Sequence, residues 1–210
     1  MLSKSGNPSL RNEVIVQTYS GGAHCCSKFS IYTWQGDGFA AENTGYLDGI
    51  GGEFKDLDGN GTKEFYALDN AFFYAFSSYV GSFPPSMILS LENGQFVDVT
   101  QQFRQELKGQ AWRMFQTFRE SQAQGYGANG ILAGYVAQKI LLGEFDQGWE
   151  FMLANYNRTS DWGLNIYNDQ GDVIGTYIDF PTALRAFLID LGYLLPDGTP
   201  NPNPNRGKAN

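Results

Sequence analysis

The sequence predicts an α+β protein, in which an N-terminal antiparallel β-sheet is followed by a C-terminal helical part packed on it. Segments rich in β-branched and aromatic residues, separated by glycine-rich turns, fill the first half. From Thr100 the apolar residues recur instead at helical spacing. The 26 glycines favour short strands joined by tight turns. We therefore expect a β-rich domain at 1–99, a helical domain at 100–195 and a flexible tail at 196–210.

Several segments of the first half have the composition of β-strands. The segment 28–34 alternates apolar with polar residues, as a half-buried strand does. Asn93-Gly94 separates two later segments, and this dipeptide is the strongest short signal for a hairpin turn. The aromatic run 71–79 fits a strand that buries alternate rings in a core. The predicted strands cover residues 13–19, 28–34, 64–68, 71–76, 86–91 and 95–99.

Four helices are predicted in the second half. Thr100 is a suitable cap for the first helix, which ends before Gly125. The last helix has the clearest boundaries, because Asp179 can cap it, Pro181 fits its first turn and Gly192 follows its end. The second and third helices cover residues 129–142 and 145–156. The predicted buried face of the first helix is Phe103, Leu107, Trp112, Phe115 and Phe118.

The charge balance excludes one class of partner. The chain has 14 Lys and Arg residues against 22 Asp and Glu residues, and a net charge of −8. Such a chain repels phosphate backbones, and no run of Lys and Arg is long enough to form a basic patch. We therefore expect no nucleic-acid partner. We also expect no membrane span, because no segment reaches the roughly 20 apolar residues that a spanning helix needs.

One acidic segment has the spacing of a calcium-binding loop that leads into a strand. Calcium takes six to eight oxygen ligands, which a loop supplies when side chains at alternate positions point inward. Gly61 stands at position six, where such a loop turns sharply. The alternative is an acidic turn that binds nothing, since Asp, Asn and Gly are also ordinary turn residues. The expected ligands are Asp56, Asp58, Asn60, the Thr62 backbone carbonyl and the Glu64 carboxylate, at positions one, three, five, seven and nine.

The segment differs from a helix-loop-helix calcium hand, because position twelve is Ala67 and a strand follows. Loop and strand resemble the repeats of the FG-GAP and VCBS families, whose Asp-x-Asp-x-Asp/Asn-Gly motif precedes a strand of a β-propeller blade. The resemblance covers residues 53–76 and implies structural calcium at the five residues named above. A closed propeller needs at least four blades. We therefore expect propeller-blade-like repeats in a small sheet or propeller fragment.

A degenerate copy of this segment precedes it. A shift of 51 residues aligns Glu13 with Glu64. It also places Ser5, Asn7 and Ser9 where the calcium loop has Asp56, Asp58 and Asn60. Because those three side chains are neutral, we expect one calcium ion at the later segment and none at the earlier copy.

His24, Cys25 and Cys26 are adjacent and include every histidine and cysteine of the chain. A soft metal site needs further ligands of these types, so we do not expect one. A disulfide between neighbours is tight, because their Cα atoms are only about 3.8 Å apart across a trans peptide. The flanking glycines ease that constraint. We favour structural cysteines, bridged or buried, over a reactive thiol activated by His24.

The stretch Gly21-Gly22-Ala23-His24-Cys25-Cys26, together with Gly148-Trp149 and Asp161-Trp162, is similar to an uncharacterised group of bacterial secreted proteins. The resemblance implies an exported protein, periplasmic or secreted, and carries no activity. Residues 1–8 lack the apolar core of a signal peptide. A removed leader fits the exported location, and a cytoplasmic protein is the less favoured alternative.

Three functions remain open at this point. The first is a calcium-stabilised, non-enzymatic binding or structural module outside the cytoplasm, with an unidentified protein or glycan partner. The second is an assembly or interaction subunit that uses its aromatic β surface, and its oligomeric state is open. The third is a hydrolase or thiol enzyme that uses His24 and Cys26. The third is the least favoured, because the sequence has no nucleophile elbow, no phosphate loop and no second histidine.

Overall fold

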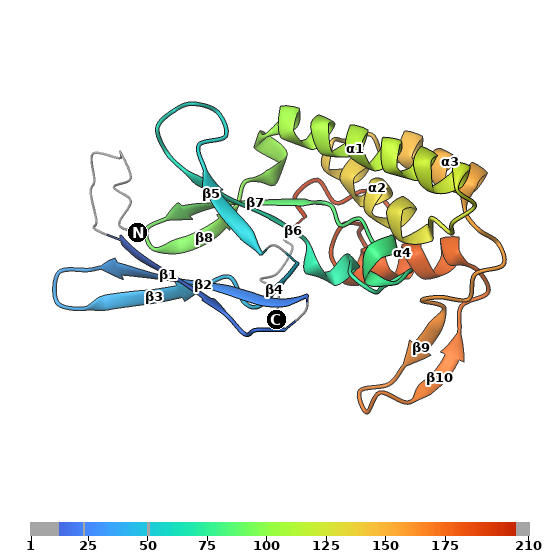
Figure 1. Cartoon of the computed structure of the whole chain (residues 1–210), viewed down its shortest axis with the longest axis horizontal. Helices are drawn as coiled ribbons and strands as arrows, with labels where there is room; N and C mark the ends of the chain where they lie inside the picture. Colours follow the sequence, from blue (N-terminus) through green and yellow to red (C-terminus); the bar gives the residue numbers. More distant parts are fainter. Residues whose placement is uncertain (1–12, 23, 50, 205–210) are drawn as a thin grey trace. The chain divides into compact units, whose positions relative to one another are not determined.

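The computed structural model describes residues 13–22, 24–49 and 51–204, which form two compact units with separate hydrophobic cores (Figure 1). The β unit contains the described residues up to Asn70 together with Ser86–Glu106. The helical unit contains Ala71–Pro85 and the described residues from Leu107 onward. The mixed α and β content confirms the coarse fold class. The division differs from the predicted boundary at residue 99, because the segment 71–85 belongs to the helical unit.

The first sheet of the β unit is an open, antiparallel, four-stranded sheet. Its strands are β1 (Glu13–Tyr19), β2 (Cys25–Trp34), β3 (Phe39–Asn43) and β4 (Leu47–Asp48). The order is β1-β2-β3, and β4 also pairs with β2. Along β2 the residues Phe29, Ile31 and Thr33 are buried while Tyr32 and Trp34 are exposed. This alternation is the pattern that the sequence predicted for a half-buried strand.

The second sheet is an antiparallel meander with the order β5-β6-β7-β8. Asn93 and Gly94 join its last two strands with φ values of 52° and 82°. Two positive φ values at the centre of a two-residue loop are typical of the hairpin turn that this dipeptide predicts, so the hairpin is confirmed. The strands are β5 (Gly52–Lys55), β6 (Glu64–Leu68), β7 (Ser86–Glu92) and β8 (Gln95–Asp98).

Phe65 lies at the centre of the core of the β unit and is 0% exposed. Its ring centroid lies 4.9 Å from that of Phe29 in the first sheet and 5.0 Å from that of Phe54 in the second. Both sheets therefore bury one face against the other. The sheets are open, and the described residues form no propeller, so the expected blade-like repeats are corrected to a pair of packed sheets.

The helical unit has four α-helices, of which the second and most buried is packed among the others. The helices are α1 (Arg104–Ala123), α2 (Asn129–Leu141), α3 (Phe145–Asn155) and α4 (Phe180–Asp190). Nearly every residue of α2 is buried. Gly148 of α3 permits close contact with α2, because a Cβ at this position would press on the Lys139 side chain. None of the helices described by the structure combines the length and apolar character needed to cross a membrane.

The predicted face of α1 is partly wrong. Leu107 and Phe118 are buried as expected, but Trp112 is 60% exposed. The buried stripe runs instead through Ala111 and Met114. Those two residues complete the 4-3-4 spacing of an amphipathic helix. The sequence pattern placed Trp112 on the buried face because its side chain is large and aromatic.

Three segments differ from their predicted structure. The run 71–79 is no strand: it contains the 3₁₀ turn η1 (Asn70–Phe72) and further turns, and Phe76 lies in the helical core. An unpredicted hairpin forms from β9 (Asn165–Tyr167) and β10 (Val173–Thr176). After α4, Asn201 donates from its backbone N–H to the Tyr193 carbonyl at 3.0 Å, within the predicted flexible tail. Residues 205–210 of that tail lie outside the described residues.

The cap of α4 is confirmed. The Asp179 carboxylate accepts a hydrogen bond from the Thr182 backbone N–H at 2.9 Å, and proline occupies the first turn. Hydrogen bonds from Thr182 hold the pKa of Asp179 below its ordinary value, because they stabilise the charged form. The helix therefore begins at the residue that the sequence indicated.

Replacement of Phe65 by alanine should destabilise the β unit by about 3–5 kcal/mol, because it leaves a cavity where two sheets meet. Urea unfolding followed by circular dichroism measures the loss. Phe39→Ala is the matched control, since Phe39 is 57% exposed, and its expected loss is below about 1 kcal/mol. Equal losses for the two variants would contradict the assigned core.

Asp179→Ala should destabilise the helical unit by about 1 kcal/mol at neutral pH, because the first turn of α4 loses its cap. The folded-state pKa of Asp179 lies below the unfolded value. The cap therefore stabilises the fold above the unfolded pKa, and this stabilisation is lost as the pH falls through the folded value. Thermal unfolding should show a larger difference between the variant and the original protein at pH 7 than at pH 2.5. Asp169→Ala, in an exposed turn, should show no such dependence.

Candidate metal centre

The acidic loop connects β5 to β6 and closes where Lys55 pairs with Glu64 across the two strands (Figure 1). Gly59 and Gly61 have φ values of 76° and 88°, a conformation that residues with a Cβ rarely adopt. The loop therefore curls back on itself between the strands. The glycine at position six turns the chain where the sequence pattern requires it.

The Asp56 carboxylate organises the loop from its first position. Its Oδ1 accepts hydrogen bonds from the backbone N–H groups of Gly59 at 2.7 Å and Asn60 at 3.1 Å. Its Oδ2 accepts from the Gly61 N–H at 3.0 Å. Three backbone donors thus converge on one side chain. This arrangement sets the curvature of the loop and fixes the carboxylate inside it.

Asp58, Asn60 and Thr62 continue the same pattern of local hydrogen bonds. Asp58 Oδ2 accepts from Asn60 Nδ2 at 2.9 Å, and Asn60 Oδ1 accepts from the Thr62 N–H at 2.7 Å. These contacts keep the side chains of Asp58 and Asn60 next to one another. The Thr62 carbonyl remains a predicted ligand.

Glu64 is the buried member of the group, with only 4% of its surface exposed. Its Oε2 accepts a hydrogen bond from the Leu57 N–H at 3.1 Å, across the base of the loop. Carboxylate oxygens of Asp56, Asp58 and Glu64 all lie within 4.8 Å of one another. The structure thus brings together the three acidic residues of the predicted ligand set.

The electrostatics of this group favour a cation. Two unit charges about 5 Å apart repel by about 1 kcal/mol even in bulk water, and by more in a partly buried site. Among the described residues, no ion pair joins Asp56, Asp58 or Glu64 to a Lys or Arg. A divalent ion would turn this repulsion into attraction. The oxygen-only donor set suits calcium.

Ser5, Asn7 and Ser9 of the degenerate first copy lie outside the described residues. Glu13, its last member, begins β1 and pairs with Thr33 of β2. Burial raises the pKa of Glu13 above its ordinary value, since desolvation penalises the charged carboxylate. The absence of calcium from the first copy stays a prediction.

Cys25 and Cys26 form a disulfide at the start of β2, across a cis peptide bond. No cysteine in the described part of the chain is free. Ser20 holds this segment: its hydroxyl donates to the Cys25 carbonyl at 2.9 Å and accepts from the Cys26 N–H at 2.7 Å. The His24 carbonyl accepts from the Gly49 N–H at 2.7 Å. A bridged Cys26 offers no thiolate, so this structure holds no nucleophile for the thiol-enzyme alternative.

Comparison with known proteins finds one matching family model and two similar proteins. Residues 107–192, within the helical unit, match the family model described as the sll0997 C-terminal domain. The chain is 41% identical over 190 residues to the "Probable thylakoid lumen protein sll0997" of Synechocystis sp., covering 86% of this chain and 56% of that protein. It is 33% identical over 196 residues to the "Uncharacterized protein y4bJ" of Sinorhizobium fredii, covering 88% of this chain and 30% of that protein.

The chain therefore spans about half of one relative and less than a third of the other. No solved structure gives a significant match. These similarities link the helical unit to a named domain. The matched residues 107–192 do not include the acidic loop.

Alkylation should distinguish the disulfide from free thiols. Denatured, unreduced protein treated with iodoacetamide should keep its intact mass, because a bridged cysteine cannot react. After reduction, the same protein should gain two alkyl groups, one for each of its 2 cysteines. Intact-mass spectrometry reads both results. Two alkyl groups on the unreduced protein would contradict the bridge.

Proposed function

We propose that this protein is a calcium-stabilised, non-enzymatic binding or structural module that works outside the cytoplasm. The observation that carries the proposal is the buried carboxylate of Glu64, which converges with Asp56 and Asp58 within 4.8 Å. A buried charge without a partner is costly. A bound cation removes that cost, and a carboxylate-rich loop selects a hard divalent ion.

The ion would act as a structural pin for the second sheet. Glu64 is the first residue of β6, and the next residue is Phe65, at the centre of the core. Calcium held between Glu64 and the start of the loop would therefore tie the β5–β6 connection to the best-packed strand. Its binding free energy would be folding free energy, because the unfolded chain has no such site.

Two observations support a compartment outside the cytoplasm. The relative from Synechocystis is described as a probable thylakoid lumen protein, and that lumen is an extracytoplasmic compartment. The Cys25–Cys26 disulfide is of a kind that persists in oxidising compartments. Calcium loops of modest charge bind in the millimolar range of extracellular modules. The site would be occupied where calcium is abundant.

One face of the first sheet favours a second candidate function, assembly with a protein or glycan partner. On this face Val14 pairs with Tyr32, and Trp34 pairs with Phe39. Paired residues of antiparallel strands point to the same side, so these four side chains form one apolar patch. All are more than a third exposed, as is Val16 two residues along β1. Exposed patches of this kind are typical of interaction sites.

Calcium should raise the melting temperature. Replacing a chelator with about 10 mM calcium, near 100 times a dissociation constant of about 0.1 mM, should add about 2.7 kcal/mol to the stability of the β unit. For a chain of this size the expected shift is about 5–10 °C. Magnesium at the same concentration should shift it less, because it tolerates a flexible oxygen cage poorly. Differential scanning calorimetry measures all three conditions.

Glu64→Gln should abolish the calcium shift while it preserves the fold. Glutamine keeps the shape of the side chain and an oxygen for the Leu57 N–H, yet it removes the charge that repels Asp56 and Asp58. Without calcium this variant should therefore match or exceed the original protein in melting temperature. Asp58→Ala should also lose the shift, and Asp169→Ala, in an exposed turn of the helical unit, should retain it. A calcium shift that survives both loop variants would sink the proposal.

Removal of the apolar patch should test the second candidate. Trp34→Ser in β2 replaces an aromatic ring that is 43% exposed, so it should leave the monomer folded. If the patch joins copies of the chain, light scattering during size-exclusion chromatography should show an oligomer for the original protein and a monomer for the variant. An unchanged oligomer in the variant would exclude this face as the contact.

A further inference from the structure

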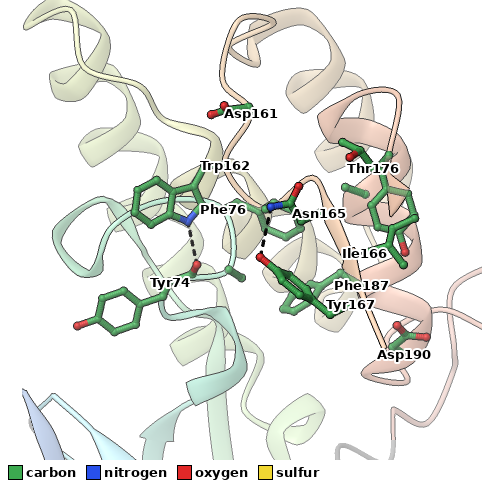
Figure 2. Close-up of a pocket in the computed structure, with 14 residues that line it drawn as sticks. Tyr74, Phe76, Asp161, Trp162, Asn165, Ile166, Tyr167, Thr176, Phe187 and Asp190 are labelled. Carbon is green, nitrogen blue, oxygen red and sulfur yellow. Dashed lines mark hydrogen bonds between the residues drawn. The ribbon is translucent and has the colours of Figure 1, made fainter. Parts of the chain in front are cut away.

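The helical unit contains a pocket of about 980 Å³ that is open to solvent and separate from the calcium loop (Figure 2). Four parts of the unit line it: the segment 74–76, the loop 161–163, the β9–β10 hairpin and α4. Phe76 and Phe187 provide apolar packing at the pocket, with ring centroids 5.2 Å apart. Its volume is within the range of pockets that hold small ligands.

Specific backbone contacts build this pocket. Trp162 donates its indole N–H to the Tyr74 carbonyl at 2.9 Å, which ties the loop to the segment 74–76. Tyr74 has a φ of 62°, which is unusual for a residue with a Cβ. Gly163 has a φ of 77°, and a Cβ there would overlap the Ala75 carbonyl and the Phe76 ring. Only glycine fits this crossing, so the shape of the pocket is encoded by these positions.

Exposed aromatic rings line the pocket. Tyr74, Trp162 and Tyr167 are 48%, 46% and 58% exposed, although rings of this size usually lie mostly inside a protein. Asn165 Nδ2 donates to the Tyr167 hydroxyl at 3.3 Å and so helps to orient that ring (Figure 2). The Tyr74 ring packs beside that of Tyr79, with centroids 5.7 Å apart, and points away from Tyr167 (Figure 2). The faces of Trp162 and Tyr167 are therefore the ones available to a ligand. Aromatic faces attract cations through the ring quadrupole.

The charges of the pocket have one sign. Asp161 and Asp190 are among its lining residues, and no Lys, Arg or His is. The two aspartates lie on opposite sides of the close-up (Figure 2). Neither carboxylate makes a side-chain hydrogen bond or an ion pair within the described part of the chain. An anionic ligand would meet two negative charges and no compensating cation, so this class is disfavoured.

We propose that this pocket binds a small organic cation of the alkylammonium class. The exposed rings of Trp162 and Tyr167 would receive the alkylated ammonium group. The carboxylates of Asp161 and Asp190 would supply its counter-charge from the rim. The rings would contact the apolar substituents of such a ligand, and the unpaired carboxylates would balance its positive charge.

Titration with tetramethylammonium chloride tests the proposal, and tert-butanol provides a neutral probe of similar shape. The readout is the Trp162 indole N–H signal in a nitrogen-proton correlation spectrum, with calcium and ionic strength held constant. This signal is assigned by its loss in Trp162→Phe. We expect a saturable shift with tetramethylammonium and none with sodium chloride at equal ionic strength. Equal affinity for tert-butanol, or no saturable shift with the ammonium probe, overturns the proposal.

Variants test the carboxylates and the aromatic rings of the site separately. The double variant Asp161→Asn and Asp190→Asn should weaken tetramethylammonium binding about tenfold at low salt, since each exposed charge contributes roughly a factor of three. The matched control is Asp37→Asn with Asp146→Asn, which removes the same charge from exposed residues that do not line the pocket and should leave the affinity unchanged. Tyr167→Leu should weaken binding about twofold to fivefold through the loss of one ring. Undiminished affinity in the double variant and in Tyr167→Leu overturns the proposal.

Discussion

The burial of Phe65 is the constraint on which the β unit depends. Its ring is 0% exposed and contacts aromatic rings from both sheets. A Cβ on Gly52 of the neighbouring strand would overlap this ring, so the packing extends to the backbone. Strand β6 is therefore fixed in place by its second residue. The position of the residue before Phe65 is therefore set as well.

That preceding residue is Glu64, which the packing of Phe65 holds in a buried position. Neighbouring residues of a strand point to opposite faces, so the core takes Phe65 while Glu64 faces the acidic loop. Burial of Phe65 thereby holds the Glu64 carboxylate in a buried position, where an unpaired charge would destabilise the fold. The Leu57 N–H satisfies one of its oxygens, and Asp56 and Asp58 lie beside it. This arrangement is the basis of the proposed calcium site.

Both proposed sites would bind positively charged ligands. The chain has a net charge of −8, both sites bring carboxylates together, and no Lys or Arg lines the pocket. Their ligands differ because their other donors differ. The loop offers oxygens in a small curl, which suits a bare divalent ion. The pocket offers π faces around a larger hollow, which suits an organic ammonium group.

Much of the local structure could be predicted because neighbouring residues determine it. The Asn93-Gly94 hairpin and the Asp179 cap depend on backbone preferences and on donors within a few residues. The curl of the acidic loop likewise depends on Asp56 and on N–H groups three to five positions later. Such contacts recur wherever the pattern recurs. The positions of the predicted acidic ligands were therefore accessible from the sequence.

Only the tertiary structure decided the features that join distant segments. The run 71–79 has the composition of a strand, yet the helical core takes Phe76, and its burial outweighs local preference. The pocket depends on Trp162 reaching Tyr74 across 88 residues, and no periodicity encodes such a contact. The sequence by itself determined the spacing of the acidic ligands. Packing decided that Glu64 is buried among them and that Asp161 and Asp190 line a hollow, because burial depends on neighbours that are remote along the chain.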